Sequence, residues 1–344
     1  SGVAPAGLPR WAAWMLVGGV TLSLVVRWTL LDQLPFIMDE LYDTNVGVMV
    51  SRGARLYADI SLERMPLLTY LVAATHRPEY GSFEAALAAR RLMWAGSALV
   101  VLLTWLLARR FQSKSFTVFA PALLLGFSNF VTSSISVRAD VLSTLLALPA
   151  LFALTARRIT TAVLLGGGVA LGAAFCTTQK AAYFSVAFAA GLLFRTWCEE
   201  PSTGRAAIRS FGRLLLVVVG SAVPLACLVA YMTYLGALRP FVDQTILWGA
   251  WVGLVADTYG SSRIHLVETL ARNPATWLFG LCGAVAVVLE GFRQARGPEV
   301  DRSAPAAALG VWTLALAGLL LQHTAKFPYV FITIAPGLAL CGGI

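Results

Sequence analysis

Ionisable side chains are scarce in this chain, and those that could do chemistry gather in a few places. Eight of the 17 Asp and Glu residues lie between residues 32 and 91, and Asp39 and Glu40 follow closely after an apolar run. A carboxylate in such a place can accept a proton from a hydroxyl group. Arg138 and Lys180 stand at the ends of later apolar runs, where a charge is costly to keep and often serves a function. A cation there can stabilise negative charge that develops during a reaction.

Apolar helices must position these groups. The chain is 58% hydrophobic and only 12% charged, which is about half the charged share of a soluble domain. Because a soluble domain needs a polar surface, this composition excludes a soluble enzyme, a disordered chain, a coiled coil and a disulfide scaffold. We predict an all-α, polytopic membrane protein. The expected transmembrane helices, about ten in number, cover residues 12–31, 92–108, 116–135, 139–156, 160–178, 181–197, 214–235, 276–292, 306–322 and 328–344.

The net charge of +9 does not indicate a nucleic-acid partner, because the basic residues form small groups between apolar runs rather than a stripe. The five cysteines have no metal-ligand spacing, and four of them lie within apolar runs. A disulfide framework or a zinc site built on them is therefore not expected.

Basic residues predict the orientation in the membrane, because cytoplasmic loops are enriched in Lys and Arg. With the N-terminus in the cytoplasm, most basic residues outside the long loops fall on the inner side, for example Arg109, Arg110, Arg157, Arg158 and Arg302. We expect one multi-pass domain over 1–344 in the plasma (inner) membrane. Its long outer segments would be residues 33–91 and 236–275, with the first of them holding the acidic cluster.

The first outer segment contains two predicted interfacial helices. Residues 39–52 have helical spacing with apolar residues on one side, which suits a helix in the membrane interface. Gly53 is a favourable C-terminal stop, and Pro66 can open a second helix over 66–74. The alternative is a solvated loop whose amphipathic helix has only a structural role.

Glycines in the fifth apolar run predict close packing between helices. Gly166, Gly167, Gly168 and Gly172 include a small-xxx-small spacing. A phosphate-binding glycine loop would need a following Lys-Ser/Thr pair, which is absent from this run.

Several short patterns occur in a characteristic order along the outer side. They are Asp39-Glu40, Tyr42, Gly53-x-x-x-Tyr57-x-Asp59, Glu63-Arg64-x-Pro66-Leu67, Tyr70, Arg138-Ala139-Asp140, Thr178-Gln179-Lys180 and Phe327-Pro328-Tyr329. Their order and spacing resemble those of GT-C glycosyltransferases that use polyprenyl-phosphate sugars. Protein O-mannosyltransferases and lipid A aminoarabinose transferases are the most similar in pattern. Arg64-Met65 replaces a Lys-Pro pair that is frequent in the family, which keeps the charge and changes its geometry.

The resemblance implies an inverting transfer of a sugar from a polyprenyl-phosphate donor to an acceptor hydroxyl on the extracytoplasmic face. Asp39 and Asp140 would be the catalytic carboxylates, with Asp39 as the base. Substrate binding would fall to Glu40, Tyr57, Glu63, Arg64, Arg138 and Lys180, with the three cations placed at the phosphate. Glu63 and His265 would be candidate ligands of a divalent cation. Membrane lipids and other protein chains are further expected partners.

Each assignment has a structural alternative. Asp39 could be only a helix cap, Asp140 could pair with Arg138 or cap its own helix, and Lys180 could extend to lipid headgroups. A transporter would place charges near the middle of the bilayer and show repeated halves, and neither pattern occurs in the sequence. A non-catalytic membrane subunit of a larger complex stays an alternative.

Overall fold

The computed structural model describes residues 9–112, 116–200, 202–248, 262–295, 297, 299–323 and 328–344, with only the backbone at 262–265 and 328. Over these residues the chain is helical, and the only β-type pairing is an isolated bridge between Leu56 and Ile60. The prediction of an all-α protein is confirmed.

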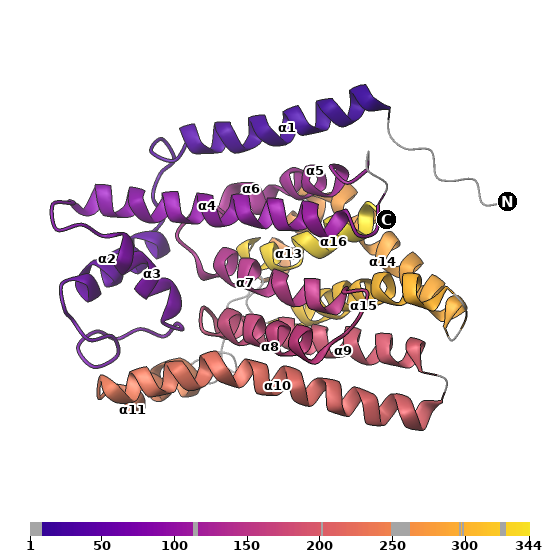
Figure 1. Cartoon of the computed structure of the whole chain (residues 1–344). Coiled ribbons are helices and arrows are strands. Elements are labelled where there is room, and N and C mark those ends of the chain that lie inside the picture. Colours follow the sequence, from indigo (N-terminus) through magenta and orange to yellow (C-terminus); the bar gives the residue numbers. More distant parts are fainter. Residues whose placement is uncertain are drawn as a thin grey trace.

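Within the described residues, six helical segments are long and apolar enough to cross a membrane. They are α1 (Arg10–Thr29), α4 (Ser82–Ala108), η1 (Gln179–Ala181) with α9 (Ala182–Glu199), α10 (Thr203–Tyr234), α14 (Pro274–Gln294) and α15 (Val300–Gln322). Two shorter apolar helices, α7 (Ala139–Leu154) and α8 (Thr161–Phe175), lie among them. One series of neighbouring helices crosses the bundle in the order α4, α7, α8 and α10 (Figure 1). In a second series, α15 packs between α9 and α14. The chain is therefore a multi-pass membrane protein.

Two of the expected spans are broken helices. Residues 116–135 form α5 (Phe119–Gly126) and α6 (Ser128–Ser133), separated at Phe127, whose backbone is extended. Residues 328–344 form η4 (Pro328–Thr333) and α16 (Ala335–Gly342). Hydropathy alone does not reveal such breaks, because the apolar composition continues through them.

Two other helices begin about ten residues earlier than expected from their apolar runs. The predicted starts were residues 92 and 214, whereas α4 begins at Ser82 and α10 at Thr203. Arginines in these first turns lower the local hydropathy, but backbone hydrogen bonding continues through them. The helices therefore extend beyond their apolar segments.

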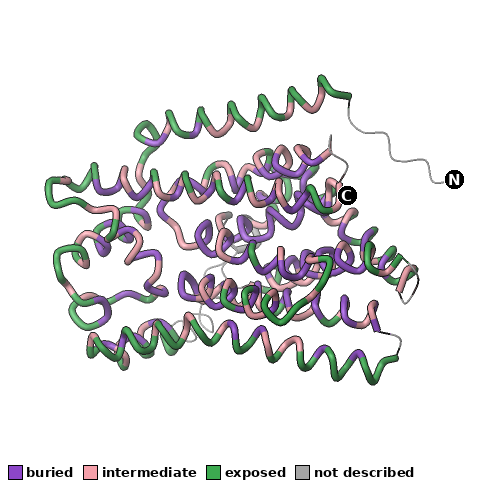
Figure 2. The backbone as a smooth tube through the Cα atoms, in the orientation of Figure 1, coloured by how far each residue is buried: buried purple, intermediate pink, exposed green. Residues whose placement is uncertain are grey.

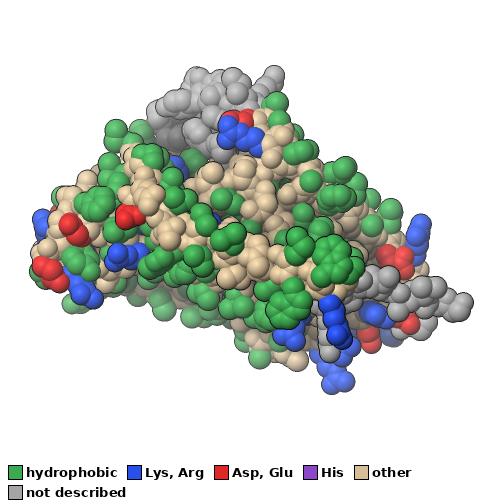
Figure 3. Space-filling view, turned by 90° about the horizontal axis from the view of Figure 1, so that it is seen from above, with side chains coloured by type: hydrophobic (Ala, Val, Ile, Leu, Met, Phe, Trp, Pro, Cys, Tyr) green, Lys and Arg blue, Asp and Glu red, His purple; other side chains and the backbone are tan. Residues whose placement is uncertain are grey.

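The buried core lies in the middle of the bundle, around α7, α9, α15 and α16 (Figure 2). In contrast α1 lies at one side, and large apolar side chains such as Trp11 and Trp14 are exposed on it. Seen from above, charged side chains lie mostly at the two ends of the molecule, and hydrophobic ones cover much of the length between them (Figure 3). Such a surface suits a protein surrounded by lipid tails.

Both helices predicted in the first long segment are present. They are α2 (Met38–Ser51) and α3 (Leu67–Thr75), which pack against each other at the end of the bundle where α4 begins (Figure 1). Gly53 has a left-handed φ of 97° just after α2, as a C-terminal stop requires, and Pro66 immediately precedes α3. The polar side of α2 faces the protein rather than open solvent, since Glu40 and Asp43 are buried.

The second long segment contains α11 (Leu238–Val242), η2 (Asp243–Leu247) and α13 (Ser262–Arg272). The helix α11 lies at the same end of the bundle as α2 (Figure 1). We call this end, with α2, α3 and α11, the α2 end.

The predicted close helix packing occurs between α8 and α10. A Cβ atom added at Gly168 would lie 2.2 Å from the backbone oxygen of Val217, and one at Gly172 would lie 2.4 Å from that of Ser221. The two backbones touch because these positions carry no side chain. Gly166, in contrast, has nothing within 4 Å of such a Cβ.

This difference gives a matched test of the interface. We expect Gly168→Ala to lower the free energy of unfolding by about 1–3 kcal/mol, because the added methyl group must push α10 away. Gly166→Ala should be neutral or stabilising by up to about 1 kcal/mol, since alanine is the better helix former. Denaturant titration of both variants in detergent would measure the difference. Equal stabilities would contradict the packing described here.

Candidate active site at the α2 end

Asp39 lies between two arginines that come from different parts of the chain. Its Oδ2 is 3.3 Å from Nη2 of Arg138, and its Oδ1 is 3.6 Å from Nη2 of Arg64. Asp39 stands in the first turn of α2, and Arg138 occupies the extended position just before α7. The Asp39 side chain is 41% exposed, so a ligand at the α2 end can reach its carboxylate.

A second acid–base pair lies beside this group. Nζ of Lys180 is 3.6 Å from Oδ1 of Asp140. Oδ1 accepts no hydrogen bond from the described residues, and the Asp140 side chain is largely buried. The alternative pairing of Asp140 with Arg138 does not occur among the ion pairs of the described residues, since Arg138 pairs with Asp39.

Tyr329 connects the two pairs. The guanidinium carbon of Arg138 lies 3.8 Å from the centroid of its ring, and Nζ of Lys180 lies 4.9 Å from the same centroid. Both distances are within the range of a cation–π contact. The ring therefore keeps two cations near each other without neutralising them by a full negative charge.

Arg64 is also held by Asp43, one turn after Asp39 on α2. Nη1 of Arg64 is 2.5 Å from Oδ2 of Asp43, whose side chain is only 2% exposed. Burial raises the pKa of Asp43 to about 6, although Arg64 acts in the opposite direction. Asp43 is thus mostly ionised at pH 7, and its ion pair with Arg64 weakens as the pH falls below about 6.

Glu40 has a different environment from the one expected for a substrate-binding residue. Its side chain is fully buried, and both carboxylate oxygens accept hydrogen bonds from Arg90, at 2.7 and 2.8 Å. Oε1 also accepts the backbone N–H of Val137. The substrate-binding role of Glu40 stays a prediction, and its carboxylate is enclosed by protein groups. Glu40 instead connects α2 to α4 and to the residue before Arg138.

Tyr57 likewise acts within the protein. It is buried, and its hydroxyl donates a 2.6 Å hydrogen bond to the backbone oxygen of Arg64. Its ring packs edge-on against Phe241 of α11. Its φ of 67° is unusual for a residue with a side chain. The substrate contact of Tyr57 stays a prediction, and the contacts of its side chain hold the Arg64 segment in position.

Gln179 joins the two long segments at the site. Its amide nitrogen donates to the backbone oxygens of Glu63, at 3.0 Å, and of Thr245 in η2, at 2.9 Å. The Glu63 side chain is exposed. Lys180, next in the chain, is thereby kept against the first segment.

The proposed metal ligands are Glu63 and His265. The Glu63 side chain is exposed, and the side chain of His265 lies outside the described residues. Within the described residues, no group of three or more His, Cys, Asp or Glu side chains is placed to hold a metal ion. Glu63 and His265 therefore stay predicted ligands.

Three contributors to the site had no role in the sequence-based prediction. Tyr329 belongs to the Phe-Pro-Tyr pattern noted there, but no chemistry was assigned to it. Asp43 follows Asp39 by one helical turn, a spacing that could have indicated a shared face. Arg90 lies within a helix some fifty residues from Glu40, and nothing in the local sequence indicates that pairing.

Solved structures of two proteins resemble this fold, whereas no family model and no curated protein sequence matches the chain. One is ArnT from Cupriavidus metallidurans bound to undecaprenyl phosphate, with 17% identity and a TM-score of 0.67 over 96% of this chain and 60% of ArnT. The other is the archaeal oligosaccharyltransferase AglB from Archaeoglobus fulgidus, in complex with an inhibitory peptide and a dolichol-phosphate. Its identity is 15% and its TM-score 0.57, over 94% of this chain and 50% of AglB.

The chain thus spans about 60% of the length of ArnT and half that of AglB. At these identities the likeness concerns the arrangement of the helices, and it extends over nearly all of this chain. Together with the apolar helices, it confirms the fold that the sequence patterns implied. The chain shares the polytopic membrane fold of ArnT and AglB.

Proposed function

We propose that this chain is the membrane domain of an inverting glycosyltransferase that takes a sugar from a polyprenyl-phosphate donor and transfers it to an acceptor hydroxyl. One observation carries the proposal: an accessible carboxylate, Asp39, lies between two arginines at one end of an apolar bundle, with the Lys180–Asp140 pair beside it. The similarity to ArnT with undecaprenyl phosphate and to AglB with a dolichol-phosphate supports this donor class.

In the proposed reaction, Asp39 accepts the proton of the acceptor hydroxyl as its oxygen attacks the anomeric carbon of the sugar. A new bond forms from that oxygen to the carbon, and the bond from the carbon to the phosphate oxygen breaks. Because attack and departure occur on opposite faces, the configuration inverts. The leaving polyprenyl phosphate gains one negative charge, which Arg138 and Lys180 would stabilise.

The ion pairs at the site suit this sequence of events. Asp39 holds Arg64 and Arg138 close together. A donor phosphate would compete for the guanidinium groups, and Asp43 would still keep Arg64 in place. Asp39 would then lose part of its ion pairing when the acceptor needs it as a base. Asp140 would orient Lys180 through their mutual contact.

Arg138→Gln should weaken donor binding and leave the fold intact. We expect the dissociation constant for polyprenyl phosphate to rise about 10- to 100-fold, the effect of losing a hydrogen bond between charged groups. Native mass spectrometry with added undecaprenyl phosphate would measure it. Arg52→Gln is a matched control, since Arg52 is exposed at the end of α2 and forms no ion pair within the described residues.

The same assay distinguishes the proposal from a non-catalytic subunit. Retained donor binding without any sugar transfer by the purified chain, together with a co-purified partner protein, would favour the subunit.

The proposal also places the α2 end on the extracytoplasmic side of the plasma membrane. Labelling of an Asp59→Cys variant by a membrane-impermeant thiol reagent in intact cells, compared with labelling of the parent and its own cysteines, would test that side.

A further inference from the structure

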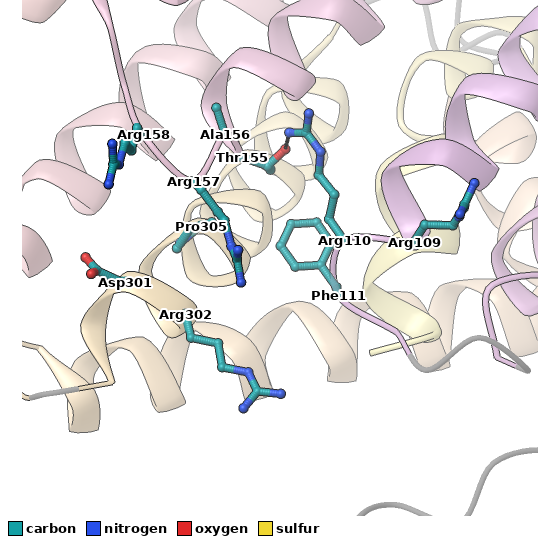
Figure 4. Close-up of a pocket in the computed structure, with 10 residues that line it drawn as sticks. All are labelled: Arg109, Arg110, Phe111, Thr155, Ala156, Arg157, Arg158, Asp301, Arg302 and Pro305. Carbon is teal, nitrogen blue, oxygen red and sulfur yellow. Dashed lines mark hydrogen bonds between the residues drawn. The ribbon is translucent and has the colours of Figure 1, made fainter.

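A basic cavity of about 1180 Å³ lies at the end of the bundle opposite Asp39. Its walls come from the end of α4, the connection from α7 to α8 and the first turns of α15 (Figure 4). Among the described residues, five arginines and one acid contribute to the lining: Arg109, Arg110, Arg157, Arg158, Arg302 and Asp301. The reaction proposed above uses none of them.

These arginines differ from others at the same end of the bundle. On α9 and α10, Arg195 and Arg213 are paired with Glu199, and Arg209 is paired with Glu200. The arginines of the cavity, in contrast, form no ion pair within the described part of the chain. A general excess of basic residues on a cytoplasmic face accounts for their number. This general excess does not explain why the five arginines converge on one cavity, or why the nearby Arg195, Arg209 and Arg213 are paired with glutamates while these five are not.

Part of the cavity is preorganised. Nη1 of Arg110 donates to the backbone oxygen of Phe152, at 2.7 Å. It also donates to the hydroxyl of Thr155, at 3.0 Å (Figure 4). Its guanidinium also lies over the Phe152 ring, 4.7 Å from the centroid. Arg110 is therefore held in one place with donors left over, whereas Arg157 and Arg302 are exposed and can close on a ligand.

The position of the cavity indicates the kind of ligand. Three apolar helices, α4, α7 and α15, begin or end at its walls, which places it at the level where a bilayer meets water. Lipid phosphates lie at this level, and basic cavities between transmembrane helices suit anionic headgroups. Guanidinium groups match phosphate oxygens in geometry as well as charge. The size of the cavity and the excess of four positive charges suit more than one phosphate.

We propose that this cavity binds the headgroup of an anionic phospholipid through its phosphate groups, and that a lipid with two phosphates binds best. The test uses the purified full chain in nanodiscs of phosphatidylcholine alone, or with phosphatidylglycerol or cardiolipin added. Native mass spectrometry after release would report the retained lipid. We expect cardiolipin to be retained most, phosphatidylglycerol less, and phosphatidylcholine not selectively.

The variant with Arg157→Gln, Arg158→Gln and Arg302→Gln should retain cardiolipin with at least about tenfold lower affinity, equivalent to the loss of one or more charged contacts. A control with Arg10→Gln, Arg205→Gln and Arg293→Gln removes the same charge from exposed positions at that end, and should bind as the parent does. Size-exclusion profiles and melting temperatures in phosphatidylcholine would show that both variants fold.

Two outcomes would overturn the proposal. Equal loss of cardiolipin in both triple variants would mean that binding follows net charge rather than the cavity. If soluble diphosphate stabilises the parent through the same three arginines and cardiolipin does not, the ligand is a free phosphate compound. Donor binding at Arg138 should be unchanged in the cavity variant, so a failure here is distinguishable from a failure of the glycosyltransferase proposal.

Discussion

Replacing Asp39 with asparagine should reduce sugar transfer by about 100-fold or more and leave donor binding nearly intact. The asparagine keeps the size of the side chain but cannot accept the proton of the acceptor hydroxyl. It also releases Arg64 and Arg138 from their ion pairs with Asp39, so the phosphate meets no new obstacle. Transfer of labelled sugar and binding of polyprenyl phosphate, measured on the same purified variant, would show a loss of turnover with an unchanged dissociation constant.

Asp59→Asn is the matched control for this experiment. Asp59 lies in the same segment, and its exposed carboxylate pairs with Arg55 rather than with Arg64 or Arg138. It should transfer sugar at close to the parent rate. If Asp39→Asn also transfers at the parent rate, Asp39 is not the base. If it loses donor binding to the same extent as turnover, the role of Asp39 is to place the arginines.

Replacing Arg90 with methionine should destabilise the protein by about 3–5 kcal/mol, because it leaves the buried carboxylate of Glu40 without its charged partner. Arg90 also donates to three backbone oxygens, those of Leu31, Leu34 and Pro35, which connect α1 to α2. Its guanidinium lies 3.8 Å from the centroid of the Phe36 ring. The change therefore removes contacts that hold α2 and the connection from α1 against α4. Denaturant unfolding in detergent would measure the loss.

The neighbouring Arg91 provides the control, because it is exposed on the same helix turn. Arg91→Met should change the stability by less than about 1 kcal/mol. The double variant with Arg90→Met and Glu40→Met should recover part of the loss, since it removes both buried charges together. A stable Arg90→Met protein with normal turnover would show that the buried pair does not hold the site.

Most of the architecture follows from the local sequence. The apolar runs predict a multi-pass helical protein, because a segment that must satisfy its backbone hydrogen bonds in lipid becomes a helix. Gly53 locates the end of α2 because glycine readily adopts a left-handed φ, and Pro66 locates the start of α3 because the φ of proline is fixed. The spacing of Gly168 and Gly172 predicts a close contact between helices, and the structure identifies α10 as the partner. These signals act within one or two helical turns.

The breaks at Phe127 and before α16 were not predictable in this way, because apolar composition continues across them. The roles of Glu40 and Tyr57 were not predictable either. Glu40 follows Asp39 in the sequence, but its side chain points to another side of α2. Only the packing of α4 against α2 shows that Arg90 pairs with Glu40. Successive residues on a helix face different surroundings, so neighbours in a motif can serve separate purposes.

The sequence by itself determined that this is a membrane protein, roughly where most of its helices lie, and which few charges are unusual enough to mark a candidate site. Only the tertiary structure decided which of those charges meet. Asp39, Arg64, Arg138, Lys180 and Tyr329 are spread over nearly the whole chain, and they converge because α2, α7, η1 and η4 present them at one end of the bundle. Burial also gives Glu40 a different environment from Asp39, because a charged group enclosed by protein must pair with an opposite charge. An accessible carboxylate can still exchange its partners for a substrate.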